Sequence, residues 1–305
     1  MDTSQKPSRC SVILANVFKT HMGRTIFDGI NFTAFSGKIC AVLGGIESGK
    51  SMLLSCIVGG NDFDSGQMWV LGGKPQTKSS KTLTKHVGYM PQEFCLYEKM
   101  TVLELILYFG QLYDINSKFI LWRLRYYNDF FTFPSSKSLV KDLSYSEKRI
   151  VSFIITVFHR PRLIVLDEPT TGLDTSKKNQ VWSYIHHMIH TWKPTIIVAT
   201  NNVEEASLAT NIVYLKDGKI IFDHDVSDLK KNHPNQSLEH IVDILHTKRN
   251  EWLHSNESKM PHDKVLTNVE TLTPRTSIWK LKTVTIKNIR VLLRSRWFFL
   301  IMYMN

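Results

Sequence analysis

A glycine-bracketed loop carries the clearest chemical signal in this sequence. Residues Gly44 to Ser51 satisfy the pattern G-x-x-x-x-G-K-[ST]. In this pattern the glycines let successive backbone N–H groups face phosphate oxygens, and the following helix adds the positive end of its dipole. Lys50 would reach the β- and γ-phosphates, and the Ser51 hydroxyl would be a Mg²⁺ ligand. We interpret the loop as a phosphate site and not as a chance turn, because Ile39–Leu43 predicts a strand before it and Met52–Val58 predicts a helix after it.

A pair of carboxylates follows a second apolar run. Leu163–Leu166 predicts a strand buried on both faces, and it ends in Asp167 and Glu168. The first carboxylate would hold Mg²⁺, and the second would orient and polarise an attacking water. Such pairs often only solvate a strand end, but the sequence Pro-Thr-Thr-Gly-Leu-Asp at 169–174 strengthens the chemical interpretation.

The segments around these residues predict an α/β fold. Further strands are expected at Ser11–Val17, Ile26–Phe35, Gln67–Leu71, Val87–Met90 and Ile196–Ala199, and a hairpin at Ile212–Leu215 and Lys219–Phe222. Helices are expected at Thr101–Tyr113, Tyr145 to about Phe158, Lys177–Trp192 and Glu204–Ala209. Capping boxes, formed by Thr101 with Glu104 and by Ser144 with Glu147, predict where the first two of these helices begin.

Composition and charge narrow the class of protein. The chain has 305 residues, of which 43% are hydrophobic, and four widely spaced cysteines that indicate reduced thiols in a cytosolic domain. We expect no signal peptide, because the N-terminus is polar as far as Cys10. The net charge of +11 is concentrated in residues 279–305, which hold six Lys or Arg and no acidic residue. This distribution favours a membrane surface over nucleic acid, although the terminal apolar run is shorter than the about 20 residues that span a bilayer.

Together these motifs resemble the nucleotide-binding domain of an ATP-binding cassette (ABC) transporter. The resemblance runs from Ser11 to about Asp228 and is carried by Gly44–Ser51, Gln92, Leu143-Ser144, Leu166–Pro169 and Gly172–Asp174. The stretches Leu53–Gly59 and Val87–Glu93 are most similar to subfamilies G and H, in which the cassette precedes the membrane domain, with arthropod subfamily H and its G-like relatives nearest.

The resemblance implies a fold and a set of site residues. The fold is an α/β P-loop cassette with a mixed β-sheet core, an antiparallel β subdomain and an α-helical subdomain at about 93–160. The ligands would be ATP and Mg²⁺. The nucleotide would be bound by His21, Gly44, Gly45, Ile46, Glu47, Ser48, Gly49, Lys50, Ser51, Met52, Ser144 and Asp174, the metal by Ser51, Gln92 and Asp167, and catalysis would involve Glu168, Gln92 and Asn201. His21 stands where the family places an aromatic residue that stacks on adenine, and a plain turn histidine is an equal alternative.

Two positions depart from the family pattern. The signature Leu-Ser-Gly-Gly-Gln, which closes over the γ-phosphate held by a second subunit, is here Leu-Ser-Tyr-Ser-Glu at 143–147. Tyr145 and Ser146 add side chains at that contact, and Glu147 places a negative charge near phosphate. Asn201 stands in place of a histidine that contacts the γ-phosphate, and asparagine cannot carry a positive charge.

These features support an ATP-binding, ATP-hydrolysing cassette that powers transmembrane transport after pairing with a second cassette, in a homo- or heterodimer. Because each departure affects a different half of the dimer, we expect slow or partner-dependent turnover. The alternative is a regulatory cassette that binds ATP without useful hydrolysis. A soluble cassette ATPase that acts on ribosomes or nucleic acid is disfavoured, because those proteins usually carry two cassettes and this sequence has one phosphate loop.

The expected organisation has three parts. Residues 1–230 would form the cassette, 231–275 a polar linker, and 276–305 a basic connecting helix and the start of a first transmembrane helix. The protein would lie at a membrane, with its cassette on the cytoplasmic side. Since the family continues through several membrane helices, we expect the chain to be a fragment, a truncated product or an incomplete gene model. Nothing in it indicates a transported substrate.

Overall fold

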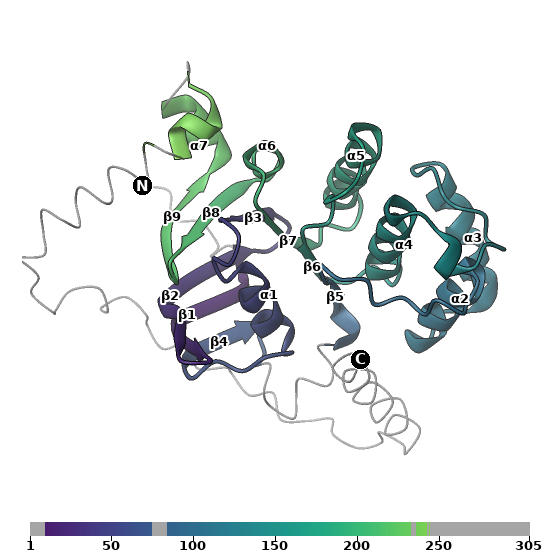
Figure 1. Ribbon diagram of the computed structural model, residues 1–305, viewed down its shortest axis with the longest axis horizontal. Coiled ribbons are helices and arrows are strands. Elements are labelled where there is room, and N and C mark those ends of the chain that lie inside the picture. The colour runs from purple at the N-terminus through teal and green to yellow at the C-terminus, as the bar shows by residue number, and fades with distance from the viewer. Residues whose placement is uncertain (1–9, 75–83, 233–235, 243, 245–305) are drawn as a thin grey trace, which may run out of the picture. The chain divides into compact units, whose positions relative to one another are not determined.

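The computed structural model describes residues 10–74, 84–232, 236–242 and 244 (Figure 1). The first of two units extends to Ile241, and all the elements discussed below belong to it. The predicted basic segment at 276–305 lies outside the described residues, as does most of the predicted linker at 231–275.

The described part of the chain contains both strands and helices, as expected. The strands are β1 (Cys10–His21), β2 (Arg24–Phe35), β3 (Ile39–Leu43), β4 (Ser65–Val70), β5 (Val87–Met90), β6 (Leu163–Asp167), β7 (Thr195–Thr200), β8 (Asn211–Lys216) and β9 (Lys219–Asp225). The α-helices are α1 (Lys50–Val58), α2 (Val102–Leu112), α3 (Ser117–Asn128), α4 (Tyr145–Val157), α5 (Thr175–Thr191), α6 (Val203–Ala206) and α7 (Val226–Asn232). Two 3₁₀ turns, η2 (Thr84–His86) and η3 (Val140–Asp142), precede β5 and α4.

A six-stranded sheet brings the chemically interesting loops to one edge. Its strand order is β5-β6-β7-β3-β8-β9, with parallel pairing from β5 to β8 and an antiparallel β8–β9 hairpin. In the parallel register Leu43 pairs with Thr200, and Asp167 pairs with Ala199. The loops that follow β3, β5, β6 and β7 therefore leave the sheet at the same end, which is where ligands bind in open α/β sheets.

A second, three-stranded sheet is antiparallel and has the order β2-β1-β4. The β1–β2 hairpin turns through Met22 and Gly23, both at positive φ, and its last pair is His21 with Arg24. The predicted fold class, a mixed α/β cassette with a separate antiparallel sheet, is confirmed.

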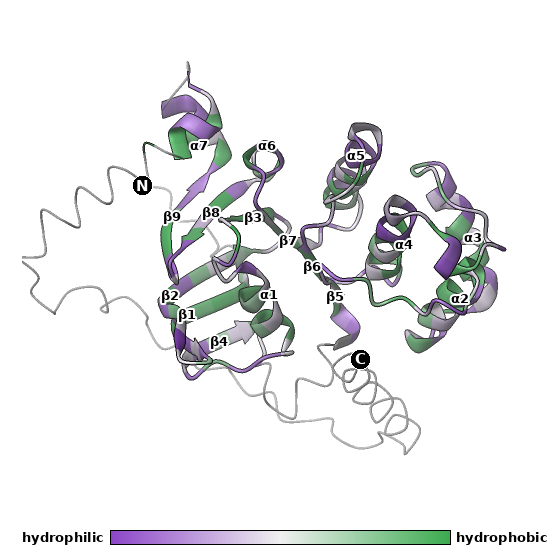
Figure 2. Cartoon of the chain, in the orientation of Figure 1, coloured by the Kyte–Doolittle hydropathy of each residue, from purple (hydrophilic) through white to green (hydrophobic). Residues whose placement is uncertain are grey.

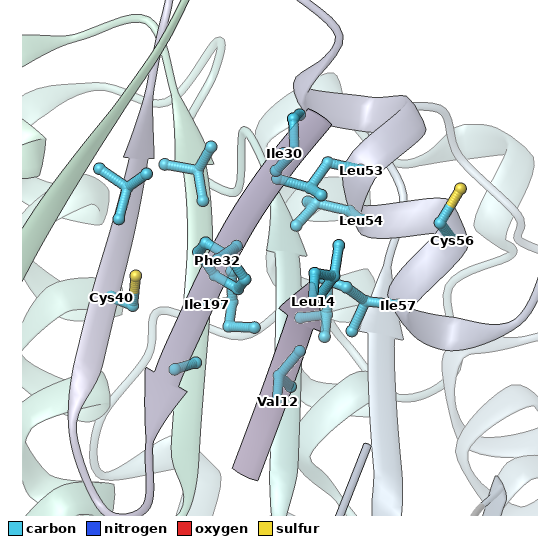
Figure 3. Packing of buried hydrophobic residues seen from close by; sticks show 14 of the residues in the cluster. Val12, Leu14, Ile30, Phe32, Cys40, Leu53, Leu54, Cys56, Ile57 and Ile197 are labelled. Atoms are coloured by element: carbon cyan, nitrogen blue, oxygen red, sulfur yellow. The ribbon is translucent and has the colours of Figure 1, made fainter. Parts of the chain in front are cut away.

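Helix α1 lies in the main hydrophobic core and joins the two sheets. Figure 3 shows Leu53, Leu54 and Ile57 of α1 among side chains from both sheets, such as Leu14 of β1 and Ile197 of β7. All five residues are at most 2% exposed. Burial of this kind stabilises the fold by about 25 cal/mol per Å² of apolar surface, so the core fixes the position of the helix that follows the phosphate loop.

The central strands and the outer helices differ in hydropathy. Every residue of β3, β6 and β7 is buried, which explains their largely apolar sequences. Helix α5 carries polar residues along much of its length (Figure 2). Only one face of α5 is apolar, and it includes Val181, Ile185 and Met188, which are fully buried.

The helical region between β5 and β6 has an aromatic interior. Helix α4 contacts β5, and α2 contacts both α3 and α4 (Figure 1). The capping boxes of Thr101 with Glu104 and of Ser144 with Glu147 are present and begin α2 and α4. The ring centroid of Tyr184 lies 5.5 Å from that of Tyr127 and 5.4 Å from that of Phe131, so much of the aromatic sequence around α3 serves packing.

The region after β9 begins with a short helix, α7, whose polar sequence shows no clear pattern of core residues. In α7, Val226 and Leu229 are buried one turn apart, and Ile241 is also buried. Among the described residues no helix is both long enough and apolar enough to cross a bilayer.

Candidate functional site

The phosphate loop places a buried lysine at the N-terminus of α1. Lys50 is 6% exposed, and its Nζ donates to the carbonyl oxygens of Gly44 at 2.9 Å and Gly45 at 2.7 Å. Burial lowers the pKa of Lys50, whereas the nearby carboxylates of Glu168 and Asp167 raise it. The ammonium group is thus held in the loop with donor capacity suited to phosphate oxygens.

Two glycines of the loop stand where a side chain would not fit. A Cβ at Gly44 would lie 2.5 Å from both the carbonyl oxygen of Leu215 and Oγ of Ser48. Gly49 caps α1 at φ 97°, a conformation that favours glycine. In contrast, a Cβ at Gly45 would meet no atom within 4 Å. The chain therefore requires glycine at Gly44 and Gly49 for local geometric reasons.

Most of the predicted site residues line one cavity of about 810 Å³. The predicted residues in its wall are His21, Ile46, Glu47, Ser48, Gly49, Lys50, Ser51, Met52, Gln92, Glu168 and Asn201. The cavity thus combines the β1–β2 turn, the phosphate loop and the ends of β5, β6 and β7. Ser48 Oγ is buried and has no hydrogen-bond partner among the described residues, so its hydrogen-bonding capacity is unused.

Asp167 lies beneath this cavity, at the end of β6. It is 2% exposed, and its Oδ1 has no hydrogen-bond partner within the described part of the chain. Burial raises the pKa of Asp167, an effect opposed by a hydrogen bond from Ser51 and by the charge of Lys50. A buried, unsatisfied carboxylate oxygen beside a serine hydroxyl suits Mg²⁺, which needs only one or two carboxylates together with substrate phosphates. The residues present therefore fit this metal, although the described residues contain no cluster of three or more acidic, His or Cys side chains.

Glu168 faces the cavity from a constrained backbone position. Its φ is 45°, its N–H donates to the carbonyl oxygen of Ala199 at 2.9 Å, and its Oε2 accepts a hydrogen bond from Thr171 Oγ1 at 2.9 Å. A non-glycine residue at positive φ is uncommon and persists where neighbouring contacts enforce it. The carboxylate is half-buried in the cavity wall, where it could act on a water beside a phosphate.

A buried carboxylate that sequence reasoning missed connects the segments that carry Glu168 and Asn201. Glu205 is 8% exposed and accepts a hydrogen bond from Thr170 Oγ1 on one oxygen and from Thr200 Oγ1, at 3.0 Å, on the other. Thr170 lies two residues after Glu168, and Thr200 directly precedes Asn201. The spacing of Asn202 and Glu205 resembles a capping box, and Asn202 does cap α6, so a sequence-based interpretation would have turned Glu205 toward the helix end.

Other predicted residues lie outside the cavity wall. The carbonyl groups of Gly44 and Gly45 face Lys50. Ser144 and Asp174 are exposed residues that cap α4 and α5, where their side chains accept hydrogen bonds from Glu147 N and Lys177 N. In this chain alone, neither Ser144 nor Asp174 reaches the site.

Four further cavity residues were not predicted. Met22, Arg24, Thr25 and Ile26 line the end of the cavity near His21. Met22 is 90% exposed. The one available signal was the short turn after His21, which brings the first residues of β2 back beside it.

The comparisons with known proteins agree with this geometry. A family model described as ABC transporter matches residues 27–171. The Nod factor export ATP-binding protein I of Rhizobium sp. (strain N33) is 30% identical over 214 residues, which cover 70% of this chain and 70% of that protein. ABC transporter G family member 23 of Dictyostelium discoideum is 29% identical over 208 residues, or 68% of this chain. The chain spans 30% of the length of that G family relative.

Solved structures show the same fold. The ATP binding subunit of an ABC transporter has a TM-score of 0.70 at 19% sequence identity, covering 77% of this chain and 99% of that one. The dimeric post-hydrolysis state of the ATP-binding cassette MJ0796, bound to ADP and Pi, has a TM-score of 0.64 at 21% identity, covering 70% and 98%. Together with the relatives, these matches show that the chain belongs to the ABC transporter family and contains its nucleotide-binding domain.

Proposed function

We propose that the cavity binds Mg-ATP and that the cassette hydrolyses it to power transmembrane transport after pairing with a second cassette. The observation that carries this proposal is the convergence of the phosphate loop, Gln92, Glu168 and Asn201 on one cavity. The relatives named above are ATP-binding proteins or members of transporter families, and one similar structure is a cassette dimer with ADP and Pi.

Each residue has a role that its position supports. Lys50 and the N-terminal N–H groups of α1 bind the β- and γ-phosphates, and Ser48 adds a hydroxyl. Glu168 accepts a proton from the attacking water, and Asn201 donates a hydrogen bond to the γ-phosphate. At the other end of the cavity, His21 stacks on the base.

Ser51, Asp167 and Gln92 are the residues proposed to hold Mg²⁺. When bound, this ion neutralises charge that develops on the phosphates. Ser51 and Gln92 line the cavity, and Asp167 supplies the unsatisfied buried oxygen beneath it.

Transport, membrane attachment and pairing go beyond a single cassette. We propose a place on the cytoplasmic side of a membrane, a G- or H-type arrangement, and a second cassette as the partner that contacts Ser144 and Asp174. The exposed positions of Ser144 and Asp174, away from their own cavity, favour such a partner. No nucleic-acid partner is proposed.

A second candidate function is a regulatory cassette that binds ATP but turns it over poorly. Tyr145 favours it, because its ring occupies a position that is glycine in the family signature. Asn201 also favours it, since a neutral amide lines the cavity where a histidine is expected. Intact Lys50 and Glu168 favour the hydrolytic function instead.

Single-turnover cleavage of radiolabelled ATP by the purified chain distinguishes the two functions, with nucleotide binding measured in parallel. Glu168→Gln is the control, because it keeps the shape and removes the basic oxygen. Cleavage that Glu168→Gln abolishes supports the hydrolytic cassette. Tight Mg-ATP binding without cleavage above the control supports the regulatory one, and an absence of binding contradicts both.

A further inference from the structure

Tyr145, the first residue of α4, makes contacts within its own chain that a glycine could not make. Its ring meets the ring of Phe94 edge-on, with centroids 4.8 Å apart. A Cβ at Gly172 would lie 2.8 Å from Cδ1 of Tyr145, so the ring rests directly on the bare backbone of that glycine. Tyr145 therefore links the segment after β5 to the segment that leads into α5.

The hydroxyl of Tyr145 is a partner for a buried arginine. Arg149 is 1% exposed, and its Nη2 donates to Tyr145 Oη at 2.9 Å. Its Nη1 donates to the carbonyl oxygen of Pro91 at 3.4 Å, and the guanidinium lies 5.0 Å from the centroid of Phe94. A buried guanidinium is costly unless its donors are satisfied, so the tyrosine hydroxyl stabilises Arg149 in this position.

These contacts surround Gln92. Pro91 directly precedes it, and Phe94 follows two residues later, so Arg149 bonds to the backbone before Gln92 while Arg149 and Tyr145 both contact the Phe94 ring after it. Gln92 itself is exposed and lines the cavity. Tyr145, in contrast, does not line the cavity.

We propose that Tyr145 is a positioning residue, which acts through Arg149 and Phe94 to hold Gln92 at the nucleotide cavity. The proposal rests on the proposed function, because it concerns the Mg²⁺ step of ATP binding. Tyr145 thus makes its contacts inside one cassette, and it increases the part of the ATP affinity that depends on Mg²⁺. A purely space-filling aromatic would instead affect stability alone.

Two variants separate the parts of this contact. Tyr145→Phe keeps the ring on Gly172 and Phe94 but removes the hydrogen bond to Arg149. Tyr145→Gly removes both. Tyr126→Phe is a matched control, because it also removes one phenol hydrogen bond, the 2.6 Å contact with His187, at a position away from the cavity.

The experiment measures ATP affinity of the full chain by isothermal titration calorimetry, in EDTA and across a Mg²⁺ titration. We expect Tyr145→Gly to raise the half-saturating Mg²⁺ concentration about tenfold, as for loss of an outer-shell partner of a metal site. Tyr145→Phe is expected to raise it about threefold, the effect of one hydrogen bond. Affinity in EDTA should stay within about twofold of the wild type for all three variants.

The possible outcomes discriminate between the proposals. An unchanged Mg²⁺ dependence in Tyr145→Gly, or an equal loss of affinity with and without Mg²⁺, overturns the positioning role while leaving ATP binding intact. A wild-type chain that binds no ATP under any condition overturns the proposed function, and this role of Tyr145 with it.

A second measurement tests the contact without any ligand. Gly172→Ala adds a Cβ that overlaps the ring of Tyr145, and it also strains a residue at φ 75°. The backbone strain is the same in the wild-type and Tyr145→Gly backgrounds, so it cancels in a double-mutant cycle of urea unfolding. We expect Gly172→Ala to destabilise the Tyr145→Gly background less than the wild type. Additive effects would show that the ring does not rest on Gly172.

Discussion

Two helix N-termini in this cassette are built in opposite ways. Helix α1 begins after Gly49 with no side-chain cap and no acidic residue in its first turn. Helix α4 begins after Ser144 with a complete capping box, in which the carboxylate of Glu147 accepts from Ser144 N at 2.8 Å and from its hydroxyl at 2.6 Å. The first N-terminus leaves its N–H groups and positive dipole end to a ligand, whereas the second is already occupied by a carboxylate of its own chain.

Under the proposed function, the difference predicts where an anion binds without rearrangement. The N-terminus of α1 opens into the cavity and holds buried Lys50. Since the first turn of α1 has no acidic residue, a phosphate would supply the negative charge that balances the lysine and the helix dipole. At α4, an incoming phosphate would meet Glu147 and the ring of Tyr145. One chain therefore has one helix N-terminus that is open to an anion and a second that its own capping box occupies.

The largest expected effect concerns the N-terminus of α1, which has no side-chain cap. Lys50→Ala removes the ammonium group, and we expect ATP to bind about 100-fold more weakly, equivalent to about 2.7 kcal/mol. Isothermal titration calorimetry measures this change. Lys38→Ala is the control, because it also removes one lysine but at a position that does not line the cavity. Lys38 forms an exposed ion pair with Asp225 at 3.8 Å, and such pairs contribute at most about 1 kcal/mol to stability. Equal affinities for wild type and Lys50→Ala would remove the contrast between the two helix ends.

The next effect concerns the loop before α1. Gly44→Ala forces a Cβ against Leu215 and Ser48, so we expect the free energy of unfolding to fall by about 2 kcal/mol. Gly45→Ala, one residue later, meets open space and should change it by less than about 0.5 kcal/mol. Urea unfolding of both variants is the measurement. Similar stabilities for the two variants would mean that the loop is not held as tightly as described.

The next prediction concerns Glu205, which joins the segments that carry Glu168 and Asn201. Glu205→Ala leaves the hydroxyls of Thr170 and Thr200 without their acceptor, and we expect about 2 kcal/mol of destabilisation in thermal or urea unfolding. Glu204→Ala, at an exposed position in the same helix, should be near neutral. A wild-type unfolding midpoint in Glu205→Ala would exclude a bracing role for this carboxylate.

The smallest expected effect concerns the N-terminus of α4, which has the capping box. Ser144→Ala removes the cap of α4 and should cost about 1 kcal/mol of stability. It should not alter ATP affinity of the isolated chain, because Ser144 does not line the cavity. A parallel loss of ATP affinity would place Ser144 at the site of its own chain.

Acid conditions sharpen the same prediction. Hydrogen bonds from Ser144 hold the pKa of Glu147 below its usual value. The capping contribution is therefore present above the pKa of the unfolded state and is lost as pH falls through the lower folded-state value. The difference in stability between wild type and Ser144→Ala should shrink between pH 7 and pH 3, and a constant difference would contradict the role of the Glu147 carboxylate.

Local sequence patterns predicted the N-terminus of α1 and the segment before it well. The five residues of β3, the glycine loop and the start of α1 were all expected, because their signals lie within one short segment. The capping boxes likewise located the starts of α2 and α4. The family resemblance implied that four distant residues meet at one site, and the strand order of the sheet agrees with this. These residues, which line one cavity, are His21, Gln92, Glu168 and Asn201.

The remaining features depend on contacts between distant segments. Nothing near Tyr145 in the sequence indicates that its ring rests on Gly172. Glu205 has the spacing of a capping residue, but its carboxylate turns to two threonines on other segments. Such choices are decided by tertiary packing, which local periodicity does not contain.

The most direct test of the central claim is calorimetric titration of ATP into the wild-type chain and Asp167→Asn, each with Mg²⁺ and with EDTA. We predict that the wild type binds ATP and that Mg²⁺ tightens binding, whereas Asp167→Asn keeps the binding seen in EDTA and loses the tightening. Because burial raises the pKa of Asp167, the neutral amide should also make the ligand-free protein more stable. A folded wild-type chain that binds no ATP, or an Asp167→Asn variant that retains the full effect of Mg²⁺, would contradict the account.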